Sequence, residues 1–417
     1  MRIEEFLNES LTPFNTKTAL EKLFKDEKEK FIEIKVGEEW NIKEDKIYLV
    51  NKDNGGFILF KVSNKTKAFK IIGSHIDSPC LKIKGPVLID SPEGKRINVE
   101  AYGGLINYSM LDIPLRIAGR VFISRKDQIE EVEVKSEKYI NIPSQCIHHN
   151  IEVNKNLSLS VQNDLLPLLG ECDDLYKFLG IKDKVISQDL YVVPAEKPFY
   201  TSEKDELLVS PRLDNLVNAY ASIKALINSD VDGIGVVCLF NNEETGSCTR
   251  YGALSDFLRS VLKGINKGLK RDKQDFYASL ENGLFVSADN GHACHQAHPE
   301  KSDPVNKCIM NKGIIIKHHT NYATDGISSG IVKLILERNK ISYQDYYNNS
   351  DIRCGSTIGP LVSTNLQMKA CDIGLAQLAM HSAIETVGAK DIKSMEKFME
   401  CFLNSKILIE GNIVKIK

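Results

Sequence analysis

Hydrophobic and polar positions follow different periods in different parts of the chain. Three apolar runs rich in β-branched residues are typical of strands buried on both faces of a sheet: 69–74, 233–240 and 283–288. Between residues 216 and 227 the apolar positions recur every three or four residues, which predicts an amphipathic helix. Strands and helices that alternate in this way indicate an α/β domain with a mostly parallel central sheet.

The stretch between about residues 85 and 202 has a different pattern. Four segments with alternating or β-branched apolar residues are separated by turn residues: 96–102, 115–124, 129–134 and 185–193. Helical periodicity is limited there to short pieces such as 173–179. We therefore predict an α/β fold in which residues 1–85 and 203–417 form one domain. A mostly-β domain of residues 86–202 is inserted between its halves.

Length and composition support this division. The chain has 417 residues, whereas a single hydrophobic core rarely serves more than about 250–300. The balance of 54 Lys+Arg against 56 Asp+Glu predicts neither nucleic acid nor a membrane as a partner. The polar start lacks signal-peptide features, and the apolar runs are far shorter than the roughly 18 residues of a membrane span. We expect a cytoplasmic protein whose ten cysteines, which form no CxxC pair, are reduced.

Ionisable residues follow the predicted strands. They are His75 and Asp77 after 69–74, Glu243 and Glu244 after 233–240, Asp289 after 283–288, and Asp214 and His381 after further apolar runs. A lone Asp or His at such a position is most often a turn former or a helix cap. In open parallel sheets, however, ligands bind at the carboxyl ends of the strands. We therefore expect these side chains to meet in one crevice.

Such a cluster predicts a metal centre, because several adjacent carboxylates cannot all ionise without cations. Two imidazoles and several carboxylates without thiolate suit zinc, with manganese or cobalt as alternatives. Two ions fit better than one, since a bridging Asp would give each ion one His and one further carboxylate, and such a pair activates water for hydrolysis. Of Glu243 and Glu244, one would bind metal and the other would serve as general base and acid. Asp77 would orient His75.

Five ordered motifs surround these residues: GSHIDSPCLKIK, SPRLDN, NNEETGS, SADNGHA and LAMHS. FLNESLTPF, EEWNI, EAYGG, IAGR and CGSTIGP extend the pattern along nearly the whole chain. Together they resemble the aspartyl aminopeptidase family, also called the aminopeptidase I family, of two-metal exopeptidases. The resemblance implies an α/β/α metallopeptidase domain with an inserted dimerisation domain. It also implies removal of the N-terminal residue, preferably an acidic one, from short peptides.

The resemblance also implies roles for individual residues. One metal would be held by His75, Asp214 and Asp289, and the other by His381, Asp214 and Glu244, with Asp214 as the bridge and Glu243 as the catalytic base. Implied substrate contacts are His292, Lys317 and Tyr322, and Lys317 is the first candidate for the cationic group that holds an acidic side chain, ahead of Lys312. Taken alone, a lysine at the end of an apolar strand is as often a snorkelling surface residue.

The inserted domain carries one further implied site residue. His148 lies in the segment IPSQCIH. In the family this histidine reaches the active site of a neighbouring subunit, although it can also be interpreted as a metal ligand. The resemblance therefore implies a homo-oligomer, with dimers that assemble into a dodecamer.

Three other interpretations of these residues stay open from the sequence. A deacylase or amidohydrolase could use the same metals on N-acylated substrates, and assays on free-amine and N-acetylated peptides would separate the two activities. A non-catalytic assembly or cargo protein could share the fold, but the intact ligand set argues against it. The segment HACHQAH resembles a separate zinc site, but its spacing fits no standard structural motif.

Overall fold

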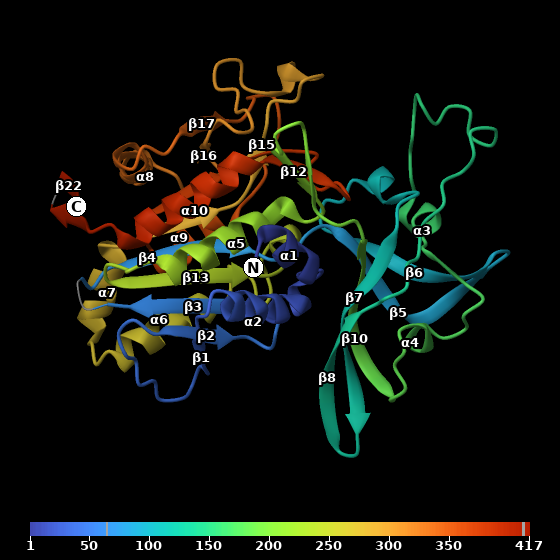
Figure 1. Cartoon of the computed structure of the whole chain (residues 1–417), viewed down its shortest axis with the longest axis horizontal. Coiled ribbons are helices and arrows are strands. Elements are labelled where there is room, and N and C mark those ends of the chain that lie inside the picture. Colours follow the sequence, from blue (N-terminus) through green and yellow to red (C-terminus); the bar gives the residue numbers. More distant parts are fainter. Residues whose placement is uncertain (64–65, 411–412) are drawn as a thin grey trace.

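A nine-stranded sheet forms the centre of the larger part of the molecule (Figure 1) in a computed structural model that describes residues 1–63, 66–410 and 413–417. In spatial order its strands are β1 (Phe31–Ile34), β2 (Ile47–Asn51), β3 (Phe57–Val62), β13 (Ile234–Phe240), β4 (Phe69–His75), β14 (Leu284–Ala288), β18 (Ala370–Gly374), β16 (Ile314–His318) and β17 (Tyr343–Tyr347). The four strands β13, β4, β14 and β18 run parallel to one another. The predicted, mostly parallel central sheet is confirmed.

Helices cover both faces of this sheet. One face packs against α1 (Ile3–Glu9), α2 (Thr16–Asp26), α5 (Leu213–Asn228), α8 (Gly326–Arg338) and α10 (Ala389–Asn404), and the other against α6 (Phe257–Gly268), α7 (Lys273–Glu281) and α9 (Ile358–Leu366). Within β13, Val237 and Leu239 belong to the first core, whereas Val236 and Cys238 belong to the second. A strand buried on both sides has no polar face, so it was readable as a continuous apolar run.

A second, antiparallel sheet lies beside the first (Figure 1). Its strands, in spatial order, are β8 (Gln128–Lys135), β7 (Leu115–Arg125), β10 (Val185–Pro194), β5 (Cys80–Ser91), β6 (Gly94–Tyr102) and β9 (Leu168–Gly170), accompanied by α3 (Val161–Asp164) and α4 (Leu175–Phe178). The sheet has a core of its own, in which Ile117, Val121 and Leu190 are fully buried. The predicted fold class, an α/β domain with an added β-rich part, is confirmed. The strand β5, inside which residue 85 falls, was not predicted.

A third sheet of five short strands was also not predicted. It consists of β11 (Phe199–Thr201), β12 (Leu207–Ser210), β20 (Glu385–Gly388), β19 (Ala376–Leu378) and β15 (Gly291–His292), and β21 (Ile407–Glu410) and β22 (Ile413–Ile416) form a separate hairpin. Asp214 and His381 follow β12 and β19 of this sheet and not strands of the central sheet. A short apolar run such as ELLVS has the same pattern in either sheet, because the sequence does not specify which strand pairs with it.

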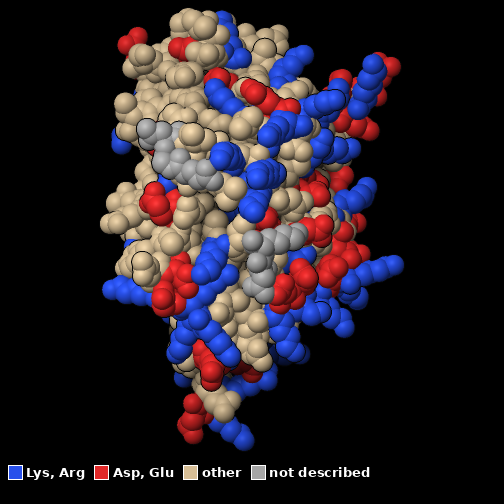
Figure 2. Space-filling view, turned by 90° about the vertical axis from the view of Figure 1, so that its left-hand side faces the viewer, with Lys and Arg blue, Asp and Glu red and all other residues tan. Residues whose placement is uncertain are grey.

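Charged residues of both signs are interspersed over the face shown in Figure 2, in line with the net charge of −2. All ten cysteines are free thiols in the structure. Within the described part of the chain, no helix combines the length and the apolar character that crossing a membrane requires.

Candidate metal centre

Three adjacent parallel strands deliver ionisable side chains to one edge of the central sheet. His75 is the last residue of β4 and pairs with Phe240 at the end of β13. The turn η3 (Glu243–Thr245) follows β13, and Asp289 follows β14. Asp214 is the second residue of α5, and His381 lies in the loop between β19 and β20. One pocket of about 300 Å³ is lined by the ionisable residues His75, Asp214, Glu243, Glu244, Asp289 and His381, together with His292, Lys317 and Tyr322.

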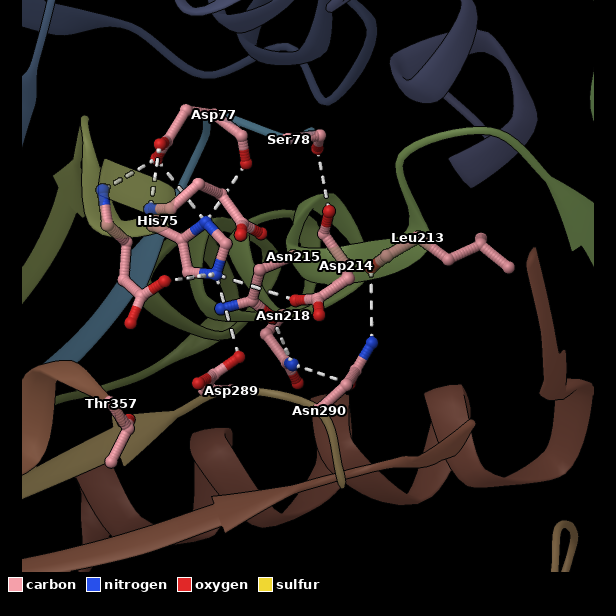
Figure 3. Close-up of polar contacts among 12 residues, drawn as sticks. His75, Asp77, Ser78, Leu213, Asp214, Asn215, Asn218, Asp289, Asn290 and Thr357 are labelled. Atoms are coloured by element: carbon pink, nitrogen blue, oxygen red, sulfur yellow. Dashed lines mark hydrogen bonds and ion pairs between the residues drawn. The ribbon is translucent and has the colours of Figure 1, made fainter. Parts of the chain in front are cut away.

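His75 is held so that one ring nitrogen faces the carboxylates (Figure 3). Its Nδ1 lies 3.0 Å from the backbone oxygen of Asp77, which can only accept a hydrogen bond. Its Nε2 lies 3.4 Å from Asp214 Oδ1 and 3.5 Å from Asp289 Oδ1. With the proton on Nδ1, the lone pair of Nε2 points at these two carboxylates, as in a histidine that binds metal.

His381 is held in the same way from the opposite side of the pocket. Its Nδ1 lies 3.1 Å from the backbone oxygen of Gly104, in the segment after β6. Its Nε2 lies 3.4 Å from Glu244 Oε1 and 3.8 Å from Asp214 Oδ2. The two oxygens of Asp214 therefore face different imidazoles, which is the arrangement expected of a bridging carboxylate.

The donor atoms fit a cation. Ligand atoms of His75, Asp214 and Glu244 all lie within 4.8 Å of one another, and no other such group of His, Cys, Asp or Glu occurs in the described chain. Asp214 Oδ1 and Glu244 Oε1 are buried and accept no hydrogen bond. A buried anionic oxygen without a partner is costly, and a metal ion would remove that cost. Among the described residues, the segment HACHQAH forms no comparable group.

Without a bound cation, the carboxylates of the centre repel one another, and this shifts the pKa values of their neighbours. Burial raises the pKa of Glu243, and the charges of Asp289 and Glu244 add to this despite the opposing effect of His75. Burial lowers the pKa of the His75 imidazole, but the adjacent carboxylates of Asp214 and Asp289 more than reverse this and raise it well above its ordinary value. The negative charge of these adjacent buried carboxylates must therefore be neutralised, either by protons or by bound metal ions.

Asp77 does not line the pocket, but it contacts residues that do. Its carboxylate accepts the backbone N–H groups of Glu243 and Glu244, at 3.2 and 3.1 Å, and the hydroxyl of Tyr102 at 2.7 Å. Asn242 in turn donates to the Tyr102 oxygen at 3.0 Å. Asp77 therefore contacts both His75 and the turn that carries the two glutamates.

A buried amide network joins the segments that follow β12 and β14 (Figure 3). Asn218 donates to Asn290 at 2.8 Å, and Asn290 donates to the backbone oxygen of Leu213 at 3.2 Å. Asn215 donates to the backbone oxygen of Ala288 at 2.7 Å. Because Asn215 and Asn290 directly follow Asp214 and Asp289, the network fixes the spacing of these two carboxylates.

Lys317 points into the protein and is not a snorkelling surface residue. It is 3% exposed, its Nζ lies 3.6 Å from Asp289 Oδ2, and it is 5.4 Å from the centre of the Tyr322 ring. Burial opposes ionisation of Asp289, but the charge of Lys317 and the contact with His75 outweigh it and hold the pKa of Asp289 below its ordinary value. Lys312, in contrast, is exposed and does not line the pocket.

His148 does not line the pocket of its own chain. It is exposed in the segment between β8 and α3 (Figure 1). Three groups that contact the centre were not predicted from the sequence: the Tyr102 hydroxyl, the Gly104 carbonyl and the carboxylate of Glu385. The signal for Glu385 was weak: a single acidic residue in the apolar run AIETV, four positions after His381.

Comparison with known proteins confirms the resemblance. The sequence profile of the family described as Aminopeptidase I zinc metalloprotease (M18) matches residues 6–403. A probable M18 family aminopeptidase 2 from Clostridium novyi (strain NT) is 35% identical over 413 residues, which cover 93% of this chain and 94% of that protein. A second probable M18 family aminopeptidase 2, from Clostridium acetobutylicum, is 32% identical over 425 residues, which cover 97% of this chain and 98% of that protein.

Solved structures show the same fold. A chain in the complex of Ape4 and Nbr1 superposes with a TM-score of 0.90 at 27% identity, covering 96% of this chain and 84% of that one. Yeast aminopeptidase 1 (Ape1) superposes with a TM-score of 0.81 at 25% identity, covering 96% of this chain and 95% of that one. The fold and the matched family, whose description is a zinc metalloprotease family, define a metallopeptidase. The chain belongs to the aminopeptidase I (M18) family, and it is an aminopeptidase.

Proposed function

We propose that this aminopeptidase binds two divalent ions, preferably zinc, and removes an acidic N-terminal residue from short peptides. The observation that carries the metal assignment is the arrangement around Asp214, whose two oxygens face His75 and His381 separately. One ion would be held by His75, Asp214 and Asp289, and the other by His381, Asp214 and Glu244. Ions bound there would polarise the scissile carbonyl and lower the pKa of a water molecule.

Glu243 is the proposed proton carrier. Its carboxylate lines the pocket, and its Oε2 lies 4.0 Å from His75 Nε2, farther than the oxygens of Asp214 and Asp289. Asp77 accepts the backbone N–H of Glu243 and so helps to hold this residue at the pocket. Glu243 is not one of the proposed metal ligands. Glu243 would take a proton from the attacking water and pass it to the leaving amine. Glu243 or Asp289 would also accept a hydrogen bond from the substrate's free α-amino group.

Lys317 supports the preference for acidic N-terminal residues. Among the described residues that line the pocket, it is the sole lysine or arginine. A carboxylate on the substrate's first residue would gain a charge-assisted hydrogen bond from its ammonium group, with His292 and Tyr322 beside it. Neutral residues would gain no such contact, and cationic ones would be repelled.

A panel of peptides that differ only at the first residue tests this preference. We expect wild-type kcat/KM to be highest for Asp and Glu. Lys317→Ala should lower it for these by roughly 10- to 100-fold, the worth of a hydrogen bond between charged groups, and leave Leu peptides within a few-fold. Lys312→Ala is the matched control and should leave the whole panel unchanged. An unaltered ratio of Asp to Leu rates in Lys317→Ala would contradict the assignment.

We further propose that residues 86–202 form a dimerisation domain and that His148 completes the site of a neighbouring subunit. The exposed residues Ile147 and Ile151 flank His148, and exposed apolar groups of this kind mark interaction surfaces. A protein of the same fold, S. cerevisiae mApe1, has been solved as a dodecamer. Light scattering should show dimers or larger assemblies of this chain, and a fully active monomer would contradict the proposal.

Subunit mixing tests the role of His148 directly. His148→Ala lacks the donated imidazole, and Asp214→Asn lacks the metal bridge, so each variant alone should have little activity. In mixed assemblies, a subunit with an intact metal site can receive His148 from its neighbour, and activity should return. If the mixture stays as inactive as its components while subunit exchange is demonstrated, His148 does not act between subunits.

A further inference from the structure

A buried carboxylate outside the pocket links two of the proposed ligand segments. Glu385, the first residue of β20, is 2% exposed. Its Oε2 accepts the backbone N–H of Asp214 at 2.9 Å, and its Oε1 accepts the backbone N–H of His381 at 2.8 Å. One side chain thus holds the main chain of both residues whose side chains face each other across the pocket.

The five-stranded sheet places Glu385 at this position. Strand β20 pairs with β12 so that Glu385 lies opposite Ser210, and the chain then turns from β12 into α5. Asp214 has non-helical backbone angles there, and His381 has a φ of 67°. Neither N–H belongs to a regular helix or strand, and a buried backbone donor requires an acceptor. Glu385 supplies that acceptor for both irregular segments at once.

We propose that Glu385 is a positioning residue of the metal centre, acting through the backbone of Asp214 and His381. This inference rests on the proposed function, because it takes these two residues as metal ligands. Glu385 itself does not line the pocket, and both of its oxygens accept N–H groups. Metal ligands must be held to within roughly 0.5 Å of their productive positions, and hydrogen bonds to a carboxylate are roughly twice as strong as neutral ones.

Asp77 has the same arrangement on the other side of the centre. Its carboxylate accepts the N–H groups of Glu243 and Glu244 at the end of the central sheet, as Glu385 does for Asp214 and His381 at the five-stranded sheet. Two buried carboxylates from different sheets therefore fix four of the site residues through their main chain. Loss of Glu385 should shift Asp214 and His381 relative to the ligands that Asp77 holds.

The test is Glu385→Gln in the full-length protein, with Co²⁺ titrated into metal-free protein. The amide keeps the shape of the side chain but replaces one acceptor oxygen with an NH₂ donor, so one of the two N–H groups loses its partner. We expect the Co²⁺ affinity to fall roughly 10- to 100-fold, as when outer contacts of metal ligands are removed, and the visible absorption bands of the bound ion to change. At saturating Co²⁺, kcat should fall with little change in KM, because Glu385 does not contact the substrate.

Asp391→Asn is the matched control. Asp391 is 1% exposed and likewise accepts two backbone N–H groups, from Asn311 at 2.5 Å and Gly313 at 2.8 Å, but it does not line the pocket. It should lower the melting temperature as Glu385→Gln does, yet bind Co²⁺ with wild-type affinity and an unchanged spectrum. The proposal is overturned if Glu385→Gln binds Co²⁺ like the wild type, or if Asp391→Asn weakens binding as much.

A second variant covers the case in which Glu385→Gln does not fold. Glu385→Asp keeps the carboxyl group but shortens the side chain, so it cannot reach both N–H groups at their present positions, and its Co²⁺ affinity should also fall. Wild-type affinity in this variant would overturn the proposal. A wild-type protein that bound no Co²⁺ would overturn the metal site itself, which separates a failure of the proposed function from a failure of the role of Glu385.

Discussion

Asp77→Asn should lower activity, because it removes a hydrogen-bond acceptor from the turn that carries Glu243 and Glu244. In the wild type, Oδ1 of Asp77 accepts from the Glu243 N–H, and Oδ2 accepts from the Glu244 N–H and the Tyr102 hydroxyl. An asparagine has only one acceptor oxygen. Whichever way its amide is turned, the NH₂ group faces one of the two backbone N–H groups, and that donor loses its partner.

The expected size of the effect follows from this count. One unsatisfied buried N–H costs about 1–3 kcal/mol, and the turn can avoid this cost only by moving towards water, which takes Glu243 and Glu244 out of position. If this free energy is lost from the stabilisation of the transition state, kcat/KM drops by roughly 5- to 150-fold. We would measure kcat/KM on a peptide with an N-terminal Asp, together with metal content.

Tyr102→Phe is the control for this prediction. It removes one donor but leaves both backbone N–H groups paired with Asp77, so its effect should stay below about tenfold. Wild-type kcat/KM in Asp77→Asn would refute the reasoning. A loss in Tyr102→Phe as large as that in Asp77→Asn would assign the effect to the tyrosine contact and not to the turn.

Further predictions concern the centre and the core. Glu243→Gln should abolish turnover and keep the metal, whereas Asp214→Asn should lose both; a fully active Glu243→Gln would contradict the proton-transfer role. Chelation should abolish activity and lower the melting temperature, and added Zn²⁺ should restore both, because bound metal stabilises the native state; activity that persists in metal-free protein would exclude the mechanism. Gly73→Ala should cost about 1–3 kcal/mol in urea unfolding, since the new Cβ would lie 2.6 Å from the Phe285 ring. Gly330→Ala, in open space on α8, should stabilise by up to about 1 kcal/mol, so equal stabilities of the two variants would contradict this packing argument.

The central sheet was predictable because its strands are buried on both faces. The runs 69–74, 233–240 and 283–288 correspond to β4, β13 and β14 with ends that agree within one residue. Of the residues predicted to follow them, His75, Glu243, Glu244 and Asp289 line one pocket, whereas Asp77 lies outside it. Here the local pattern and the tertiary position agree, since the carboxyl ends of adjacent parallel strands must lie at the same edge.

The five-stranded sheet was not predictable from the same kind of pattern. Its strands β15 and β19 have two and three residues, too few for a period to be recognised. The role of Glu385 depends on pairing between β12 and β20, which lie far apart in sequence. Similarly, the position of Lys317 inside the protein follows from the Asp289 carboxylate beside it, and a single lysine after an apolar run does not reveal that contact.

Anomalous X-ray scattering at the zinc edge, from crystals grown with Zn²⁺, would show whether two ions bind around Asp214. We expect two peaks per chain, roughly 3.5–4 Å apart, with Asp214 between them. One peak should lie against His75 and Asp289, and the other against His381 and Glu244. A peak at the histidines of HACHQAH with none at Asp214, or no peak at all in a protein that remains active, would contradict this expectation.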